Sequence, residues 1–221
     1  MAFGLVGSSV SWVLAKELLP SGVRTVVVCP REEDASQILA DTQFFLRLLT
    51  QKPPVRLYPY PARSTDLHPS QLEEPHVRVQ RLNALHQLVE SSEPVIVIAS
   101  FQALAQITLP KPLMTKLANI FAPGMEADRD VITRLLVEAG YDAESLVEEK
   151  GTFSARGSIL DVFPPNADSP FRFEFDGDRI ESIRHFDPET QRSLGPCEEA
   201  VFVPARELIL NEETCREGLA R

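Results

Sequence analysis

The sequence predicts an α/β protein in which a parallel sheet with helices is followed by a small α+β domain built on an antiparallel sheet. In the first half, apolar β-branched runs alternate with segments of helical periodicity, a pattern typical of a parallel sheet with helices on both faces. From about residue 118 the pattern changes to short β-patterned pieces separated by turn signals. A chain of 221 residues is long enough for one large or two modest domains.

The strands expected in the first half are short and apolar. Residues 25–29 (TVVVC) and 95–99 (VIVIA) contain no charged side chain, which predicts strands buried on both faces of a sheet. Residues 55–58 are expected to form another strand. The proline-rich segment 58–70 that follows it is expected to lack regular structure.

Helices are expected between these strands, at residues 11–19, 30–49 and 74–90, and a further one is expected after Ser100, whose hydroxyl suits an N-cap. The first is expected to end at Pro20. Helical spacing predicts buried positions at Ile38, Phe45, Leu48 and Leu49 in the second helix and at Leu82, Leu85, Leu88 and Val89 in the third.

The second half begins with one helix and continues as β-structure. Residues 126–141 (EADRDVITRLLVEAGY) predict an amphipathic helix ended by Gly140. The tripeptide Asp176-Gly177-Asp178 is typical of a tight hairpin turn, because Asp and Gly tolerate positive φ. Strands are expected at 146–147, 152–156, 158–163, 171–175 and 179–186.

Charge is unevenly distributed along the chain. The net charge is −10, and residues 118–203 contain 18 acidic and 8 basic side chains, so the excess of negative charge lies in the second half. Nucleic-acid binding depends on Lys and Arg side chains that neutralise phosphates. The second region is therefore expected to bind a protein.

Other features argue against cofactors and membranes. Cys29, Cys197 and Cys215 are too few and too scattered for a disulfide framework, and the four histidines lack zinc-binding spacing. We therefore expect no metal and no other cofactor. The apolar runs are too short to cross a bilayer and no signal-peptide pattern is present, so we expect a cytoplasmic protein without a membrane partner.

The octet GLVGSSVS at residues 4–11 has the frame of a phosphate-binding loop without its functional parts. Gly4 takes the first glycine position and Gly7 lies within the loop, while Ser9 and Val10 replace the second glycine and the lysine of G-x-x-x-x-G-K-[ST]. Ser11 fits the last position. The octet is either a degenerate phosphate loop or simply the start of a helix, and both interpretations predict no ATP binding.

Residues 151–193, GTFSARGSILDVFPPNADSPFRFEFDGDRIESIRHFDPETQRS, carry a family resemblance. Their A-R-G-[SG]-I-[LV]-D-[VI]-F-P strand pair, hairpin and F-D-P-x-T motif resemble a stretch shared by the excision-repair helicase UvrB and the Mfd family of transcription-repair coupling factors. UvrB keeps an intact phosphate loop at the opening octet, whereas the coupling factors carry a decayed copy there. The sequence is therefore similar to the coupling factors.

The resemblance implies a domain arrangement and a function. Residues 1–116 would be the first part of a degenerate helicase-like (P-loop NTPase-like) domain, residues 117–203 an inserted domain that binds UvrA, and residues 204–221 the start of the return to the first domain. The chain would be the non-catalytic N-terminal part of an ATP-dependent DNA translocase, which meets RNA polymerase and duplex DNA elsewhere in its length. A far C-terminal region of that protein would also pack against this part.

The same resemblance implies which residues contact UvrA. The matching positions are Arg156 in Ala-Arg-Gly and Arg172 in Pro-Phe-Arg-Phe, and strand alternation places Arg172 opposite the neighbouring phenylalanines. Asp176 stands where many relatives have a second aromatic residue. The alternative is that both arginines only form local ion pairs.

Two further functions stay open at the sequence level. The chain could be a fragment of a UvrB-type subunit that binds ATP and DNA, or a DNA-binding module that uses basic residues of the first domain. Arg78 and Arg81 are expected on an outward, solvated helix face, and contact with nucleic acid is the alternative for them. Asp161 resembles a catalytic acid but has no partner at a defined spacing, so a buried or turn hydrogen bond is its expected role, and no catalytic residue is predicted.

Overall fold

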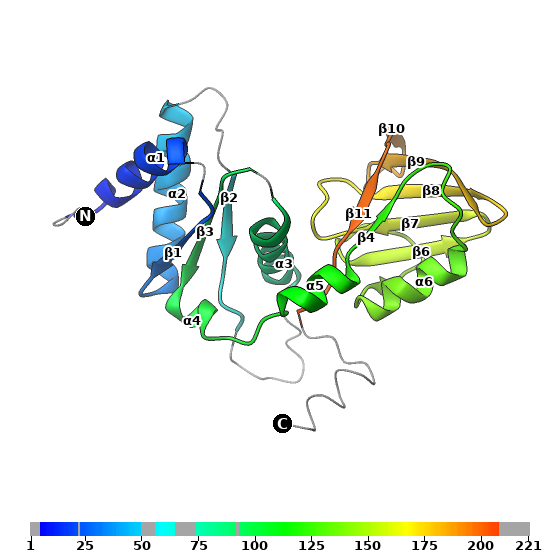
Figure 1. Cartoon of the computed structure of the whole chain (residues 1–221), viewed down its shortest axis with the longest axis horizontal. Coiled ribbons are helices and arrows are strands. Elements are labelled where there is room, and N and C mark those ends of the chain that lie inside the picture. The colour runs from blue at the N-terminus through cyan, green and yellow to red at the C-terminus, as the bar shows by residue number, and fades with distance from the viewer. Residues whose placement is uncertain (1–4, 22, 50–55, 65–73, 92, 208–221) are drawn as a thin grey trace, which may run out of the picture. The chain divides into compact units, whose positions relative to one another are not determined.

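The computed structural model describes residues 5–21, 23–49, 56–64, 74–91 and 93–207. The chain divides into two compact units, one up to Ile107 and one from Thr108, and each is described by itself (Figure 1). The expected mixture of parallel and antiparallel sheets is confirmed. The boundaries 116/117 and 203/204 stay a prediction, and residues 208–221 lie outside the described part of the chain.

The first unit is built on a three-stranded parallel sheet. Its strands are β1 (Thr25–Cys29), β2 (Arg56–Tyr60) and β3 (Val95–Ser100), in the order β1-β3-β2. The central strand β3 is buried at every residue. Every side chain of this strand can be buried because strands lie on both of its sides and helices cover both faces of the sheet.

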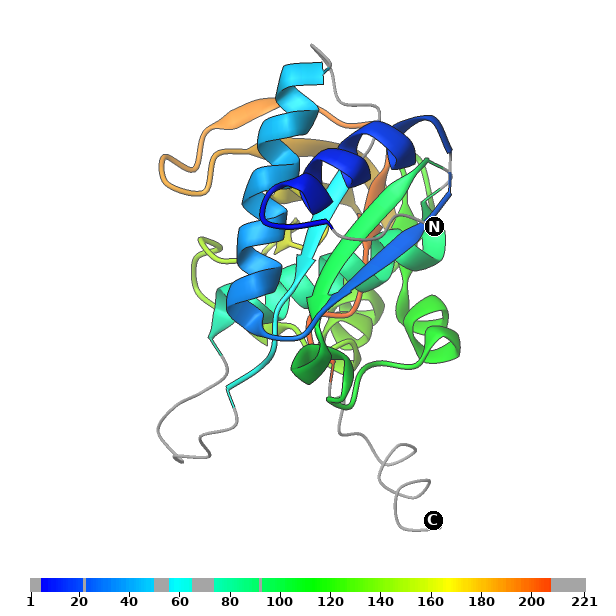
Figure 2. The same cartoon turned by 90° about the vertical axis from the view of Figure 1, so that its left-hand side faces the viewer.

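Helices cover both faces of this sheet, as expected. Helix α2 (Glu32–Leu49) packs on one face and α3 (Pro75–Glu90) on the other, while α1 (Ser9–Ser21) packs against α2 (Figures 1 and 2). The short helix α4 (Phe101–Leu104) follows β3 directly. The Ser100 hydroxyl accepts a hydrogen bond from the Ala103 amide at 3.0 Å, which confirms the predicted cap.

The buried face of α2 differs from the prediction. Its buried residues are Ala35, Thr42 and Leu46, whereas Leu48 and Leu49 are 66% and 40% exposed. A helix of 18 residues is about 27 Å long and a five-residue strand about 17 Å. The last turn of α2 therefore extends past the strands, where helical periodicity no longer decides burial.

Strand β1 is not buried on both faces, contrary to the prediction. Val26 and Val28 are 44% and 53% exposed. β1 is an edge strand, and α3 packs on β2 and β3 rather than on β1. Composition identifies an apolar strand but does not reveal which of its faces the helices cover.

Strand β2 runs two residues further into the proline-rich segment than expected and includes Pro59 and Tyr60. The Arg56 amide donates to Pro94, on the side of β3, so by alternation the nitrogen of Pro59 points away from β3. On an edge strand no hydrogen bond is lost by a proline at such a position.

The second unit is built on a six-stranded sheet of order β10-β9-β8-β7-β6-β5. All neighbours pair antiparallel except β5 and β6. The predicted hairpin turn is confirmed, and Gly177 has φ of 59°. The strands are β5 (Asp142–Ala143), β6 (Thr152–Arg156), β7 (Ile159–Phe163), β8 (Phe171–Asp176), β9 (Arg179–Phe186) and β10 (Ser193–Pro196).

The strand expected at residues 146–147 is wrong, because pairing occurs earlier, in β5. Val147 is nevertheless fully buried, since it packs with Phe163 and Phe186 in a small cluster. The two-residue apolar pattern therefore identified a buried side chain, but that side chain belongs to a loop that packs on the sheet and not to a strand.

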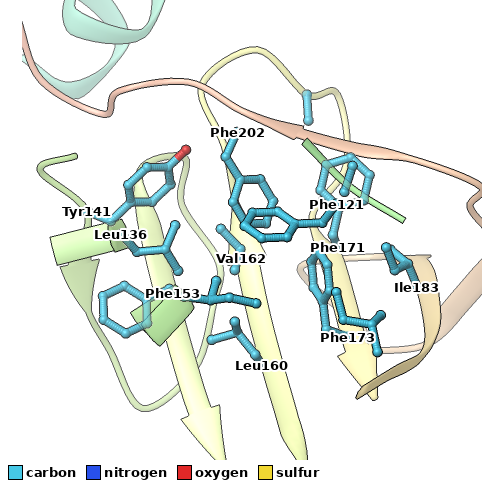
Figure 3. Close-up of a cluster of buried hydrophobic side chains, with 14 of the residues drawn as sticks. Phe121, Leu136, Tyr141, Phe153, Leu160, Val162, Phe171, Phe173, Ile183 and Phe202 are labelled. Carbon is cyan, nitrogen blue, oxygen red and sulfur yellow. The ribbon is translucent and has the colours of Figure 1, made fainter. Parts of the chain in front are cut away.

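The core of the second unit lies on one face of the six-stranded sheet. Helix α6 (Arg129–Glu138) packs there with the two-stranded sheet of β4 (Asn119–Phe121) and β11 (Ala200–Phe202), and the helix α5 (Lys111–Leu117) precedes β4. Figure 3 shows this core, with Leu136 of α6 near Phe153 at one end and Phe121 near Phe173 and Ile183 at the other. Helix α6 ends just before Gly140, which has φ of 86°, as the sequence predicts.

Candidate partner-binding face of the antiparallel sheet

Strand alternation separates the core of the second unit from a polar surface. Phe171, Phe173 and Phe175 of β8 are buried, so Arg172 and Glu174 between them stand on the opposite side of the sheet. We call this side the outer face. Its charged side chains on strands β6 to β9 include Arg156, Asp161, Arg172, Glu174, Asp176 and Arg184.

Asp161 of β7 is the centre of the outer face. Its side chain is fully buried, and pairing register places it opposite Arg172 of β8. Arg172 donates from Nε to Oδ1 at 2.7 Å and from Nη2 to Oδ2 at 2.8 Å. Arg156 donates from Nη2 to the same Oδ2 at 3.0 Å. The expectation that Asp161 is a buried, hydrogen-bonded carboxylate is confirmed, and the two arginines selected from the sequence share this one acceptor.

The guanidinium of Arg172 contacts other groups of the protein on each side except the one that faces solvent. Its guanidinium stacks on the ring of Phe186 at 4.6 Å and lies 3.4 Å from the backbone carbonyl of Gln191. The hydrogen bonds to Asp161 raise the pKa of Arg172 above its ordinary value, so this group stays charged. Its side chain is 22% exposed. Arg172 therefore presents a fixed cationic edge rather than a mobile side chain.

The F-D-P-x-T segment explains how Gln191 reaches this position. The Asp187 carboxylate accepts hydrogen bonds from the amides of Glu189 and Thr190 at 3.0 and 2.8 Å, which closes a tight loop. The bond from the Thr190 amide is the main cause that lowers the pKa of Asp187. Gln191, at φ of 58°, then directs its side chain back to the Val147 carbonyl at 3.2 Å. Sequence reasoning did not find this supporting role, since the loop lies far from Arg172 along the chain.

Arg156 ends β6 and is more exposed than Arg172. Its side chain is 51% exposed, so most of its guanidinium borders solvent. The turn after it contains Gly157 at φ of 57°, and Arg129 of α6 donates a hydrogen bond to the Gly157 carbonyl. The helix thereby supports the turn that positions Arg156.

A third arginine of the outer face was missed from the sequence. Arg184 of β9 lies opposite Arg172 in register and is 47% exposed. It lies 3.5 Å from Glu174, whose carboxylate also accepts a 2.6 Å hydrogen bond from Ser182. The signal was present, because alternation from the buried Ile183 places Arg184 on the outer face.

Asp176 lies on the same face but at its end. It closes β8 opposite Arg179 and is exposed, two residues beyond Glu174 on the same side of the strand. The structure therefore brings Arg156, Arg172 and Asp176 to one face of one sheet, with only the two arginines in direct contact with Asp161.

The octet that resembles a phosphate loop leads into α1. Gly4 lies outside the described residues, and Gly7 has φ of 58°. The Ser9 hydroxyl donates to the Val6 carbonyl at 2.8 Å and accepts from the Val6 amide at 2.9 Å, and Val10 is half-buried. Ser11 is 1% exposed and donates to the Ile38 carbonyl of α2 at 3.3 Å. Its hydroxyl is thus used in packing α1 against α2.

The prediction for Arg81 is wrong. This side chain is fully buried rather than solvated, while Arg78 on the same helix is half-buried. The Arg81 guanidinium lies 4.0 Å from the centre of the Tyr60 ring and donates to the Pro61 carbonyl at 2.7 Å. Arg81 thereby links the end of β2 to the segment after β3, in which its guanidinium also donates to the Gln106 side-chain oxygen at 3.3 Å. Helical periodicity alone could not indicate this, because arginine is mostly exposed.

Neither a metal cluster nor a membrane-spanning helix occurs in the described part of the chain. No group of three His, Cys, Asp or Glu side chains there is placed to hold a metal ion. Within the same residues, no helix combines the length and the apolar character that crossing a bilayer requires. Cys29 is buried and Cys197 half-buried, and Cys215 lies outside the described residues.

Comparison with known proteins assigns the second unit. Residues 120–208 match the family described as the UvrB interaction domain. The transcription-repair-coupling factor of Myxococcus xanthus is 39% identical over 96% of this chain, and the match spans 18% of that protein. The transcription-repair-coupling factor of Bacillus subtilis is 32% identical over 63% of this chain, and the match spans 12% of that protein. The UvrABC system protein B of Thermosipho africanus is 26% identical over 98% of the chain and 33% of its own length. Residues 120–208, which carry the outer face, therefore match the UvrB interaction domain family, in a chain that is similar over 96% of its length to the transcription-repair-coupling factor of Myxococcus xanthus.

Proposed function

We propose that this chain is a non-catalytic recruiting module of a transcription-repair coupling factor, and that the outer face of its second unit binds UvrA. One observation carries the proposal. The family match at residues 120–208 includes both Arg156 and Arg172, and these two side chains meet on one carboxylate at a solvent-facing surface. UvrA recruitment for nucleotide excision repair is the activity that fits this family and this surface together.

The chemistry of the outer face supports a protein partner. Arginine is enriched at the centres of interfaces because its planar guanidinium forms several directed hydrogen bonds and also stacks on apolar groups. Arg156, Arg172 and Arg184 present such groups within a region that is otherwise acidic. A partner surface with carboxylates opposite these arginines would be complementary, and the surrounding negative charge would discourage non-specific binding to nucleic acid.

The first unit has a different place in the proposal. Its parallel sheet with helices on both faces is consistent with a helicase-like domain of the P-loop NTPase type that has lost its phosphate loop. The parent protein would be an ATP-dependent DNA translocase that meets RNA polymerase and duplex DNA through other regions, with a C-terminal region covering the outer face when repair is not under way. The proposed location is the cytoplasm.

The test is binding of this chain to purified UvrA, with Arg156→Ala and Arg172→Ala compared with the unsubstituted chain. We expect each substitution to weaken binding by about 1–3 kcal/mol, as truncation of interface arginines does. Arg206→Ala is the matched control, because Arg206 is also a half-exposed arginine paired with a carboxylate of the second unit, Asp142, at 2.6 Å. Affinity unchanged in both outer-face variants would show that this surface is not the binding site.

The runner-up function is a fragment of a UvrB-type helicase subunit that binds ATP and DNA. The similarity to UvrABC system protein B over 98% of the chain favours it. The replacement of the loop lysine by Val10 and the use of the Ser11 hydroxyl inside the unit speak against it.

A further inference from the structure

Asp161 stands out on the outer face because it is fully buried and yet accepts hydrogen bonds from two solvent-facing arginines. Both of its carboxylate oxygens are used, Oδ1 by Arg172 and Oδ2 by Arg172 and Arg156. A buried carboxylate is tolerated in a protein only when it is paired and hydrogen-bonded. A buried carboxylate that orients two arginines of one surface also determines the shape and charge of that surface.

Asp161 cannot itself reach a partner. Its side chain has no exposed surface, whereas those of Arg172 and Arg156 are 22% and 51% exposed. The strand that carries it is fixed on both sides, by β6 through the pair Ser154–Asp161 and by β8 through the pair Asp161–Arg172. Any effect of Asp161 on binding must therefore pass through the arginines.

The arginines retain donors for a partner while Asp161 holds them. Arg172 uses Nε and Nη2 toward Asp161, while Nη1 lies 3.4 Å from the Gln191 carbonyl and Nη2 also lies 3.4 Å from the Gln191 side-chain oxygen, so one N–H of Nη1 remains for an outward acceptor. Arg156 uses only one Nη2 hydrogen bond among the described residues. A guanidinium has five N–H donors, so both groups can bind outward acceptors without leaving Asp161.

We propose that Asp161 is a positioning residue for the partner-binding face. It holds Arg156 and Arg172 in one orientation, so the conformational entropy of these two long side chains is already lost before the partner binds. This proposal rests on the proposed function of the outer face. The ligand it implies is a carboxylate-bearing protein surface, because carboxylate geometry matches the guanidinium edge that remains exposed.

The negative charge of Asp161 also acts on partner binding in the opposite direction. Asp161 also neutralises part of the positive charge, and its removal would leave both arginines freer to attract an acidic partner. We expect orientation to dominate, since attraction between solvent-exposed charges contributes little net free energy, while the loss of conformational freedom of a long side chain must be met in full on binding. Tighter binding after removal of the Asp161 charge would overturn the proposal.

The experiment is a double-mutant cycle with UvrA as the probe and the whole 221-residue chain as the binding partner. Asp161→Asn keeps the shape of the side chain and removes its charge. We expect it to weaken UvrA binding by about tenfold in the unsubstituted chain and by less than about twofold in the Arg156→Ala/Arg172→Ala background. An equal loss in both backgrounds, or no loss in the unsubstituted chain, would overturn the proposal.

A matched control separates positioning from a general effect of a lost ion pair. Asp142→Asn removes the negative charge that pairs with Arg206 at 2.6 Å in the same unit, and should leave the UvrA affinity unchanged. A loss similar to that of Asp161→Asn would count against the proposal.

A measurement on the free protein distinguishes failure of this inference from failure of the proposed function. Because Nε of Arg172 donates to Asp161 at 2.7 Å, its Hε should give a slowly exchanging ¹H–¹⁵N signal, and Asp161→Asn should accelerate that exchange. If the unsubstituted chain does not bind UvrA, the proposed function fails while this signal still tests the positioning. An Hε signal insensitive to Asp161→Asn would refute the positioning even if UvrA binds.

A second variant covers the case in which Asp161→Asn does not fold. Arg172→Lys keeps the positive charge but cannot form the two parallel hydrogen bonds to Asp161. The proposal expects this variant to bind UvrA several-fold more weakly than the unsubstituted chain. Full affinity of Arg172→Lys would mean that charge alone is sufficient and that no orientation is required.

Discussion

At the scale of single residues, arginine shows how differently one side chain type can be used in this protein. Arg81 is fully buried and Arg172 half-buried, although the sequence predicts an exposed position for both. In each case an aromatic ring lies under the guanidinium, Tyr60 for Arg81 and Phe186 for Arg172. The difference in role follows from the acceptors. Arg81 binds backbone carbonyls and side chains inside its unit, whereas Arg172 binds a buried carboxylate and faces solvent.

Arg81→Met should destabilise the first unit by about 2–4 kcal/mol, because it removes a buried set of donors from acceptors such as the half-buried Pro61 carbonyl and the buried Tyr60 hydroxyl. Urea unfolding followed by the fluorescence of Trp12, the single tryptophan of the chain and part of the first unit, measures this loss. Arg78→Met on the same helix is the control and should lose less than half as much, since Arg78 is only half-buried. Equal losses would show that the buried network contributes nothing specific.

At the scale of elements, position in the sheet decides what each strand tolerates. The central strand β3 is wholly buried, the edge strand β1 exposes alternate valines, and the edge strand β2 accommodates Pro59.

Helix α3 covers β2 and β3 and carries the half-buried His86, whose Nδ1 is buried without a hydrogen-bond partner in the described structure. Burial is the main cause that lowers the pKa of His86 below its ordinary value of 6.5, and Glu90 acts weakly in the opposite sense.

The first unit should therefore lose stability as the pH falls below 6.5. The unfolded chain takes up a proton at His86 near that pH, whereas the folded chain resists protonation until its lower folded-state pKa is reached. Urea unfolding of the first unit at pH 7.5 and at pH 5, again by Trp12 fluorescence, measures the effect. His86→Gln should reduce this pH dependence, and His76→Gln, at an exposed position beside Glu74, should not. The same slope in the chain with and without His86 would contradict the assignment.

At the scale of the whole molecule, the two units differ in the kind of sheet on which each is built. The first unit is built on a parallel sheet with helices on both faces, its opening octet lacks the lysine and the second glycine of a phosphate loop, and the Ser11 hydroxyl donates to the Ile38 carbonyl of α2. The antiparallel sheet of the second unit carries the outer face. Function is thus expected from the second unit, and nucleotide binding from neither.

Titration of the chain with Mg-ATP should show no binding up to about 1 mM, because no group in the octet can replace the missing lysine at the phosphates. Isothermal calorimetry or Trp12 fluorescence, which reports directly on α1, detects any binding. Micromolar affinity would remove the degenerate-loop interpretation and favour the UvrB-type alternative.

The sequence by itself determined the alternation of strands and helices in the first unit, the change from a parallel to an antiparallel sheet, the hairpin at Gly177 and the outward direction of Arg172. These follow from local periodicity and turn chemistry, which a few neighbouring residues encode. Only the tertiary structure decided that Arg81 is buried, that β1 is half-exposed, and that Asp161 unites two arginines from strands at either side of it. The reason is physical: burial and pairing depend on which segments, distant along the chain, come to lie on a given face, and no local pattern contains that information.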